Sequence, residues 1–196
     1  MIKLKDILLE GKPSTIFIPR RVEDRTERLI SLYIRNGNKG NLDLSDLNLT
    51  KLPEILKDIT VGGNFYCSHN KLTSLINAPK IVTGNFTCYN NFLTSLEGAP
   101  KVVDGSFDCG YNKLTSLENS PKSVSGDFYC INNKLTSLVG APKIVGGDFW
   151  CSYNLLTTLE GAPKVVGKDF FCNGNPGNFT SEQVRAICDV KGRIIV

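Results

Sequence analysis

The chain has 196 residues, 41% of them hydrophobic and 21% charged, a composition typical of one globular domain. No apolar run reaches the roughly 18–20 residues of a membrane helix, so we expect no membrane partner. Because the chain has a single histidine, multi-histidine metal centres are excluded and His-dependent catalytic triads are disfavoured. The net charge of +4 arises in residues 1–40, which hold nine Lys or Arg and five Asp or Glu, too small an excess to indicate nucleic-acid binding.

Residues 1–10 form a short amphipathic segment in which charges interrupt the apolar residues. Because it has no unbroken apolar core, we expect no secretory signal, a cytoplasmic location and reduced cysteines. The run Leu8-Leu9-Glu10 before Gly11 resembles the capsid-targeting segment of internal head proteins of T-even-like bacteriophages. That resemblance implies a processing site at Leu8, Glu10 and Gly11, and a protein packaged in the virion. An ordinary N-terminal helical turn is the alternative.

Residues 11–41 are predicted to form a helical cap. Leu29, Ile30 and Tyr33 lie at helical spacing, and Gly37 follows as a stop signal.

A 21-residue repeat dominates residues 42–179. The unit reads Val-x-Gly-x-Phe-x-Cys-x-x-Asn-x-Leu-Thr-Ser-Leu-x-Gly-Ala-Pro-Lys, and its cysteines are Cys67, Cys88, Cys109, Cys130, Cys151 and Cys172. A fixed period without insertions predicts a solenoid with one unit per coil.

Within each unit, the alternation x-Phe-x-Cys-x predicts a short strand whose Phe and Cys point into the core. Stacked coils would pair these strands in parallel, about 4.8 Å apart. The Asn that follows is expected to bond backbone groups of the turn, while two leucines fill the opposite wall. Thiols spread along an axis cannot converge on one metal ion, so they are predicted to be core residues, and no metal or other cofactor is expected.

The unit resembles the leucine-rich repeat, most clearly in the opening coil, Leu42-Asp-Leu44-Ser-Asp-Leu47-Asn-Leu49. It also looks like leucine-rich-repeat proteins of large tailed bacteriophages. The resemblance implies an α/β repeat solenoid with one short parallel strand per coil. Phe and Cys replace leucines of the usual pattern, so the curvature is not fixed by it.

Residues 180–196 are predicted to form a C-terminal cap. Thr180 and Gln183 fit a capping box that opens a short helix, and residues 194–196 fit a final edge strand.

The outward positions of the strands carry most of the aromatic residues. Side chains two apart share a face, which places five of the six tyrosines and the only tryptophan on or beside the concave side. Clustered Tyr and Trp are typical of binding hot spots, although aromatic residues also favour strand surfaces in general. The predicted partner-binding residues are Tyr66, Tyr89, Asp108, Tyr111, Asp127, Tyr129, Ile131, Asp148, Trp150, Tyr153 and Phe171.

The charges of this face argue against nucleic acid as the partner. Its three outward columns contain four aspartates and no Lys or Arg, which would repel phosphates. The lysine column that follows each proline, from Lys80 to Lys164, fits a solubilising edge, and the alternative is a row of charges that tracks a polyanion.

The sequence therefore predicts a non-enzymatic module that binds a protein with a basic or apolar contact surface. The resemblances imply a phage-encoded protein that blocks a host protein, which could be a defence enzyme. A structural or internal head component of a phage particle is the alternative.

Overall fold

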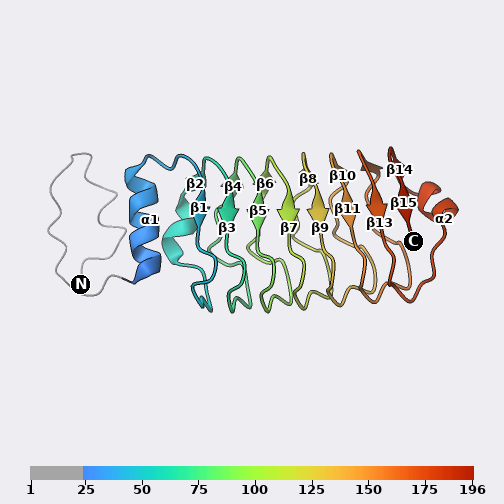
Figure 1. The fold of residues 1–196 in the computed structure, drawn as a ribbon, viewed down its shortest axis with the longest axis horizontal. Helices are drawn as coiled ribbons and strands as arrows, with labels where there is room; N and C mark the ends of the chain where they lie inside the picture. Colours follow the sequence, from blue (N-terminus) through green and yellow to red (C-terminus); the bar gives the residue numbers. More distant parts are fainter. Residues whose placement is uncertain (1–23) are drawn as a thin grey trace, which may run out of the picture.

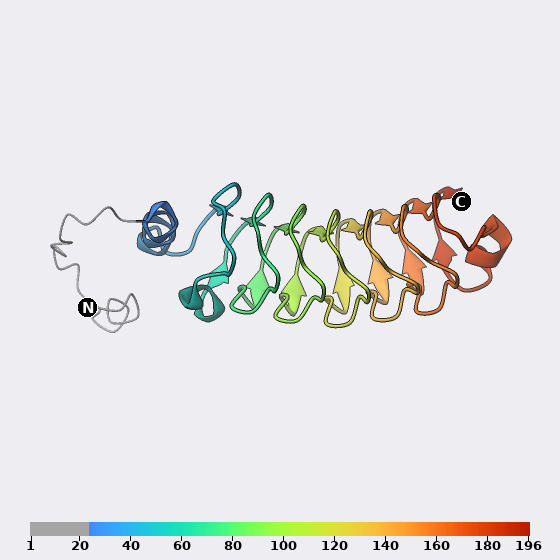
Figure 2. The same cartoon turned by 90° about the horizontal axis from the view of Figure 1, so that it is seen from below.

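The coils of the chain lie in one row between two small helices (Figure 1). The computed structural model describes residues 24–196, so the predicted processing site at Leu8, Glu10 and Gly11 lies outside the described residues. Helix α1 (Arg25–Arg35) stands at the N-terminal end of the row and α2 (Ser181–Arg185) at the C-terminal end. The row is only gently curved (Figure 2). No helix among residues 24–196 is long and apolar enough to cross a membrane.

An eight-stranded parallel sheet runs the length of the row, with one two-residue strand from each coil. Equivalent residues of successive coils face each other, as Phe128 faces Phe107 and Phe149. The predicted solenoid with one parallel strand per 21-residue coil is confirmed. The strands are β1 (Leu42–Asp43), β3 (Phe65–Tyr66), β5 (Phe86–Thr87), β7 (Phe107–Asp108), β9 (Phe128–Tyr129), β11 (Phe149–Trp150), β13 (Phe170–Phe171) and β15 (Ile194–Ile195).

The inward column of phenylalanines forms the centre of the core. All six rings from Phe65 to Phe170 are fully buried, and the ring centroids of neighbours lie 5.1–5.7 Å apart. The cysteines two residues later and both leucine columns are also buried. Each coil buries this apolar side only against the next coil, because a single coil has no core of its own.

A second set of short strands lies on a separate side of the coils (Figure 2). Their valines recur at the first position of the repeat unit, but no strand was predicted there. Only one of the two residues in most of them is buried, which leaves too short an alternation to signal a strand. They form a three-stranded sheet of β2 (Thr60–Val61), β4 (Ile81–Val82) and β6 (Val102–Val103), and a four-stranded sheet of β8 (Ser123–Val124), β10 (Ile144–Val145), β12 (Val165–Val166) and β14 (Asp189–Val190).

The repeated asparagine bonds backbone groups of the turn, as predicted, and it also joins each coil to the previous one. The Asn133 side-chain oxygen accepts the Leu114 backbone N–H at 2.9 Å. Its Nδ2 donates to the carbonyls of Cys109 and Cys130 at 3.1 and 3.2 Å. One buried amide thus satisfies three backbone groups that the turn leaves unpaired, and the same pattern recurs at Asn91, Asn112 and Asn154.

Both ends are covered by short helices in the predicted places. At the N-terminus, Ile30 and Tyr33 are buried, α1 lies against β1, and Gly37 follows with φ +68°. The first coil also holds the 3-10 helix η2 (Glu54–Asp58). At the C-terminus the predicted capping box of Thr180 and Gln183 is present. The segment after α2 contributes two strands, β14 and β15, which extend two of the sheets.

The core position of Phe128 generates a stability prediction. Phe128→Ala should lower the free energy of unfolding by about 3–5 kcal/mol, because it opens a cavity in a fully buried stack. Denaturant unfolding followed by circular dichroism measures this. Ile144→Ala, at a position 52% exposed, is the control and should have a much smaller effect. Equal effects of the two substitutions would contradict the inward phenylalanine column.

Candidate protein-binding surface

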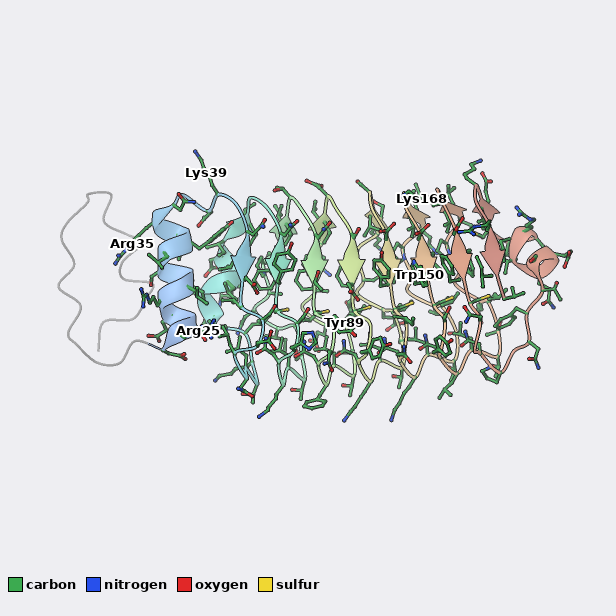
Figure 3. The ribbon with its side chains drawn as sticks, in the orientation of Figure 1. Arg25, Arg35, Lys39, Tyr89, Trp150 and Lys168 are labelled. Carbon is green, nitrogen blue, oxygen red and sulfur yellow. The ribbon has the colours of Figure 1, made fainter. Side chains whose placement is uncertain are left out.

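The outward side chains of the eight-stranded sheet and of the turn after each strand form one continuous surface, which we call the strand face. Figure 3 shows Trp150 beside its strand and Tyr89 nearer the turn that follows the strands. The register of the sheet places the second residue of every strand in one column, in the order Asp43, Tyr66, Thr87, Asp108, Tyr129, Trp150, Phe171 and Ile195.

Three predicted anchor residues form a continuous aromatic stack on this face. The Trp150 ring lies 3.6 Å from the Phe171 ring, centroid to centroid, with 11° between the planes. Tyr129 stacks on the other side of Trp150 at 6.0 Å and 25°. The Trp150 Nε1–H is buried and has no hydrogen-bond partner among the described residues. An unpaired buried donor is unfavourable, so no hydrogen bond of the Nε1–H holds the indole in this position.

A second group of rings, the corner cluster, consists of His69, Tyr89 and Tyr111. The Tyr89 ring centroid lies 5.4 Å from that of His69 and 4.9 Å from that of Tyr111. His69 also contacts Asn90, whose Nδ2 lies 2.9 Å from His69 Nδ1. The structure therefore brings the predicted residues Tyr89 and Tyr111 together.

Three aromatic residues of the strand face occupy a left-handed backbone position. His69, Tyr111 and Tyr153 have φ values of +53°, +52° and +54°. In the alternating coils this position holds Asn90, Asn132 and Gly174, which accept it at lower cost. Strained residues of this kind are enriched at functional sites, and Tyr111 and Tyr153 are about half exposed, at 46% and 54%.

The predicted residues Asp127 and Asp148 take part in a ladder between coils. Asp127 Oδ1 accepts the Asp148 backbone N–H at 2.8 Å, and Asp148 Oδ1 accepts the Asp169 N–H at 2.9 Å. Asn64, Asn85 and Ser106 hold the same column in earlier coils with the same bond. These carboxylates therefore join neighbouring coils in addition to their predicted role in attracting a basic partner.

Arg193, which was not predicted to lie on the strand face, is at the end of this ladder. Asp169 accepts from Arg193, with Nη2 to Oδ2 at 2.7 Å and the backbone N–H to Oδ1 at 2.8 Å. These bonds to Arg193 lower the pKa of Asp169. Arg193 belongs to no repeat in the sequence, and only the pairing of β15 with β13 places it in this column.

Asp108 has a different environment from the other aspartates. Its Oδ1 accepts the backbone N–H of Gly110 in its own coil at 2.9 Å, and no Lys or Arg among the described residues forms an ion pair with it. Burial raises the pKa of Asp108 to about 6, and the Gly110 hydrogen bond opposes that shift only in part.

The remaining predicted residues lie at the edges of these groups. Tyr66 contacts neither aromatic group and accepts a hydrogen bond from Asn64 Nδ2 on its hydroxyl at 2.7 Å. Ile131 lies over Gly110, where a Cβ would come within 3.0 Å of Ile131 Cγ2. Tyr153 stands apart from both groups and covers Gly174.

The cysteine column faces the core beneath the strand face. Cys109 Sγ donates to the carbonyl of Tyr129 in the next coil at 3.3 Å, and Cys88, Cys130 and Cys151 repeat this contact. Burial raises the pKa of Cys172 and Cys188 to about 11 and that of the other five thiols further. Within residues 24–196, no group of three or more His, Cys, Asp or Glu could hold a metal ion.

These thiol environments predict slow modification. Ellman's reagent at pH 8 should react with the native protein only as fast as the coils open, because the thiolate is the nucleophile and burial disfavours it. Cys172 and Cys188, in the last coils, should react first. Full reaction of all seven cysteines should follow immediately after denaturation, and rapid reaction of the native column would contradict the structure.

The environment of Asp108 predicts a pH-dependent penalty. Because its folded pKa is about 6 and its unfolded pKa about 4, the folded chain binds this proton more tightly, and stability falls as the pH rises through this range. Asp108→Asn should therefore raise the free energy of unfolding by about 2 kcal/mol at pH 8 and change it little at pH 4. Denaturant titrations of both proteins at the two pH values measure the difference, and a pH-independent difference would contradict this assignment.

Comparison with known proteins supports the fold. No protein-family model and no curated protein matches the chain. Among solved structures, the leucine-rich-repeat domain of a Shigella effector is similar, with a TM-score of 0.57 and 21% sequence identity over 91% of this chain and 90% of that one. No comparison supports the predicted phage resemblance or the head-targeting segment. The chain has the fold of a leucine-rich-repeat solenoid.

Proposed function

We propose that the chain is a binding module that holds another protein against the strand face and so blocks the surface it covers. Leucine-rich-repeat solenoids are typically non-catalytic modules for protein interaction, and their stacked strands supply an extended binding surface. The similar Shigella domain belongs to an effector protein, which is consistent with this role. No finding points to a catalytic centre in the described part of the chain.

The observation that carries the proposal is the aromatic stack of Tyr129, Trp150 and Phe171. These large rings point outward from a rigid sheet and leave a buried indole N–H without a partner. Tyr and Trp on such a surface contribute large contact area with little loss of side-chain freedom, the composition of an interface centre. A packing role alone would not require outward rings, because the core below is already filled by the phenylalanine column.

The character of the partner follows from the charges on the strand face. Its aspartates disfavour nucleic acid, and its aromatic groups favour a protein surface with basic or apolar residues. The hypotheses that the chain is phage-encoded, blocks a host protein or is a virion component depend on resemblances in sequence. They remain predictions.

The proposal predicts that a captured partner depends on the indole. The full chain should retain a specific protein from a cell lysate, and Trp150→Ala should weaken binding of the purified partner by about 2 kcal/mol or more. Mass spectrometry identifies the protein, and calorimetry measures both affinities.

Ile144→Ala is the matched control, because Ile144 is 52% exposed but lies in β10, which belongs to a different sheet. This variant should bind like the original chain, and both variants should show the same strand signal by circular dichroism. A partner that binds Trp150→Ala unchanged but is lost with Ile144→Ala would place the interface elsewhere.

A further inference from the structure

The carboxylates of the strand face differ in whether the chain itself satisfies them. Each of Asp127, Asp148 and Asp169 accepts the backbone N–H of the next coil. Asp127 Oδ2 also accepts the Tyr129 hydroxyl at 2.9 Å, and Asp169 is paired with Arg193. These three aspartates act in the solenoid as Asn64 and Asn85 do.

The Asp108 carboxylate has no such role between coils. Asp108 lies in another column, between Thr87 and Tyr129 of the neighbouring strands, and its carboxylate accepts one hydrogen bond, from the backbone N–H of Gly110 in its own coil. The three ion pairs of the described residues involve Glu54, Asp189 and Asp169, and none involves Asp108. The centre of the strand face therefore presents a partly buried carboxylate without a cation.

Three tyrosines lie in the coil of Asp108 or in the coils on either side of it. Tyr129, in the same column one coil on, begins the aromatic stack. Tyr89 and Tyr111 belong to the corner cluster and lie toward the turn. Tyr89 is in the coil before Asp108, and Tyr111 is in the same coil as Asp108. Burial is the main cause of the raised pKa of both Tyr89 and Tyr129. Tyr111 adds to the first shift, Asp127 and Asp148 add to the second, and Asp108 makes the smallest contribution to each.

We propose that Asp108, Tyr89, Tyr111 and Tyr129 form a subsite for an arginine side chain of the protein partner. This proposal rests on the proposed function and names the chemistry of its central contact. The guanidinium group would donate hydrogen bonds to the Asp108 carboxylate and lie against the tyrosine rings, which attract cations at their faces. Arginine fits better than lysine because its planar, weakly hydrated group both stacks and leaves water more readily.

Charge complementarity is the argument for this occupant. A partly buried carboxylate without a cation is unfavourable in the chain alone, and a partner cation removes that penalty on binding. An anionic or purely apolar partner would leave the carboxylate buried and unpaired.

The test uses a small probe of defined charge. N-acetyl-arginine methylamide is titrated into the full chain, and NMR follows the Asp108 carboxyl carbon and the rings of Tyr89, Tyr111 and Tyr129. N-acetyl-citrulline methylamide, which has nearly the same shape without the charge, is titrated in parallel. The citrulline probe should bind about tenfold more weakly, as should the arginine probe to Asp108→Asn.

Asp104→Asn is the matched control variant. It removes one carboxylate from the coil of Asp108 at an exposed position that is not among the predicted binding residues, so it should bind the arginine probe like the original chain. Equal binding of the two probes, no loss in Asp108→Asn, or no shift at Asp108 with arginine overturns the subsite.

Failure of the subsite and failure of the proposed function give different results. A partner that depends on Trp150, combined with no preference for the arginine probe, keeps the strand face as the interface and removes the arginine contact. Specific arginine binding at Asp108, combined with a partner that Trp150→Ala still holds, supports the subsite and contradicts the role of the aromatic stack.

Discussion

Each coil depends on the next for its buried backbone hydrogen bonds, and the inward asparagine makes that dependence specific. The Asn133 side chain accepts the Leu114 N–H of the preceding coil and donates to the carbonyls of Cys109 and Cys130. A coil without this amide would therefore bury three unsatisfied backbone groups. The amide reaches these groups only when successive coils are in register. Parallel strand pairing, the phenylalanine column and the cysteine contacts all follow from that register.

The strand face is therefore held rigidly without any disulfide among the described residues. Rings such as Trp150 and Tyr129 stand on strands whose inward neighbours, Phe149 and Phe128, are fully buried. A preorganised surface loses little freedom on binding, which lowers the cost of recognition. The unpaired carboxylate of Asp108 and the left-handed tyrosines show that stability is not maximal at this face.

Prediction from the sequence succeeded where a position recurs and failed where only the fold brings residues together. The period of 21 was enough to assign Phe and Cys to the core, the asparagine to the turn and the aromatic residues to the outward columns. The second strands were missed because pairs such as Ile81–Val82 are too short to show alternation. Arg193 was missed because it lies beyond the repeats. The sequence also could not show that the Asp127 carboxylate bonds the next coil while that of Asp108 bonds only its own coil.

The constant register also fixes the spacing of the outward residues along the strand face. Every coil displaces the next set of outward residues by about 4.8 Å, so the distance from the corner cluster to the Trp150 stack is a whole number of coils. Evolution can change that distance by duplicating or deleting one unit of the gene, because the new junction joins surfaces that already match. Insertion of a single residue would break the asparagine contacts instead. The spacing of binding features is thus inherited in steps, while their chemistry can vary one residue at a time.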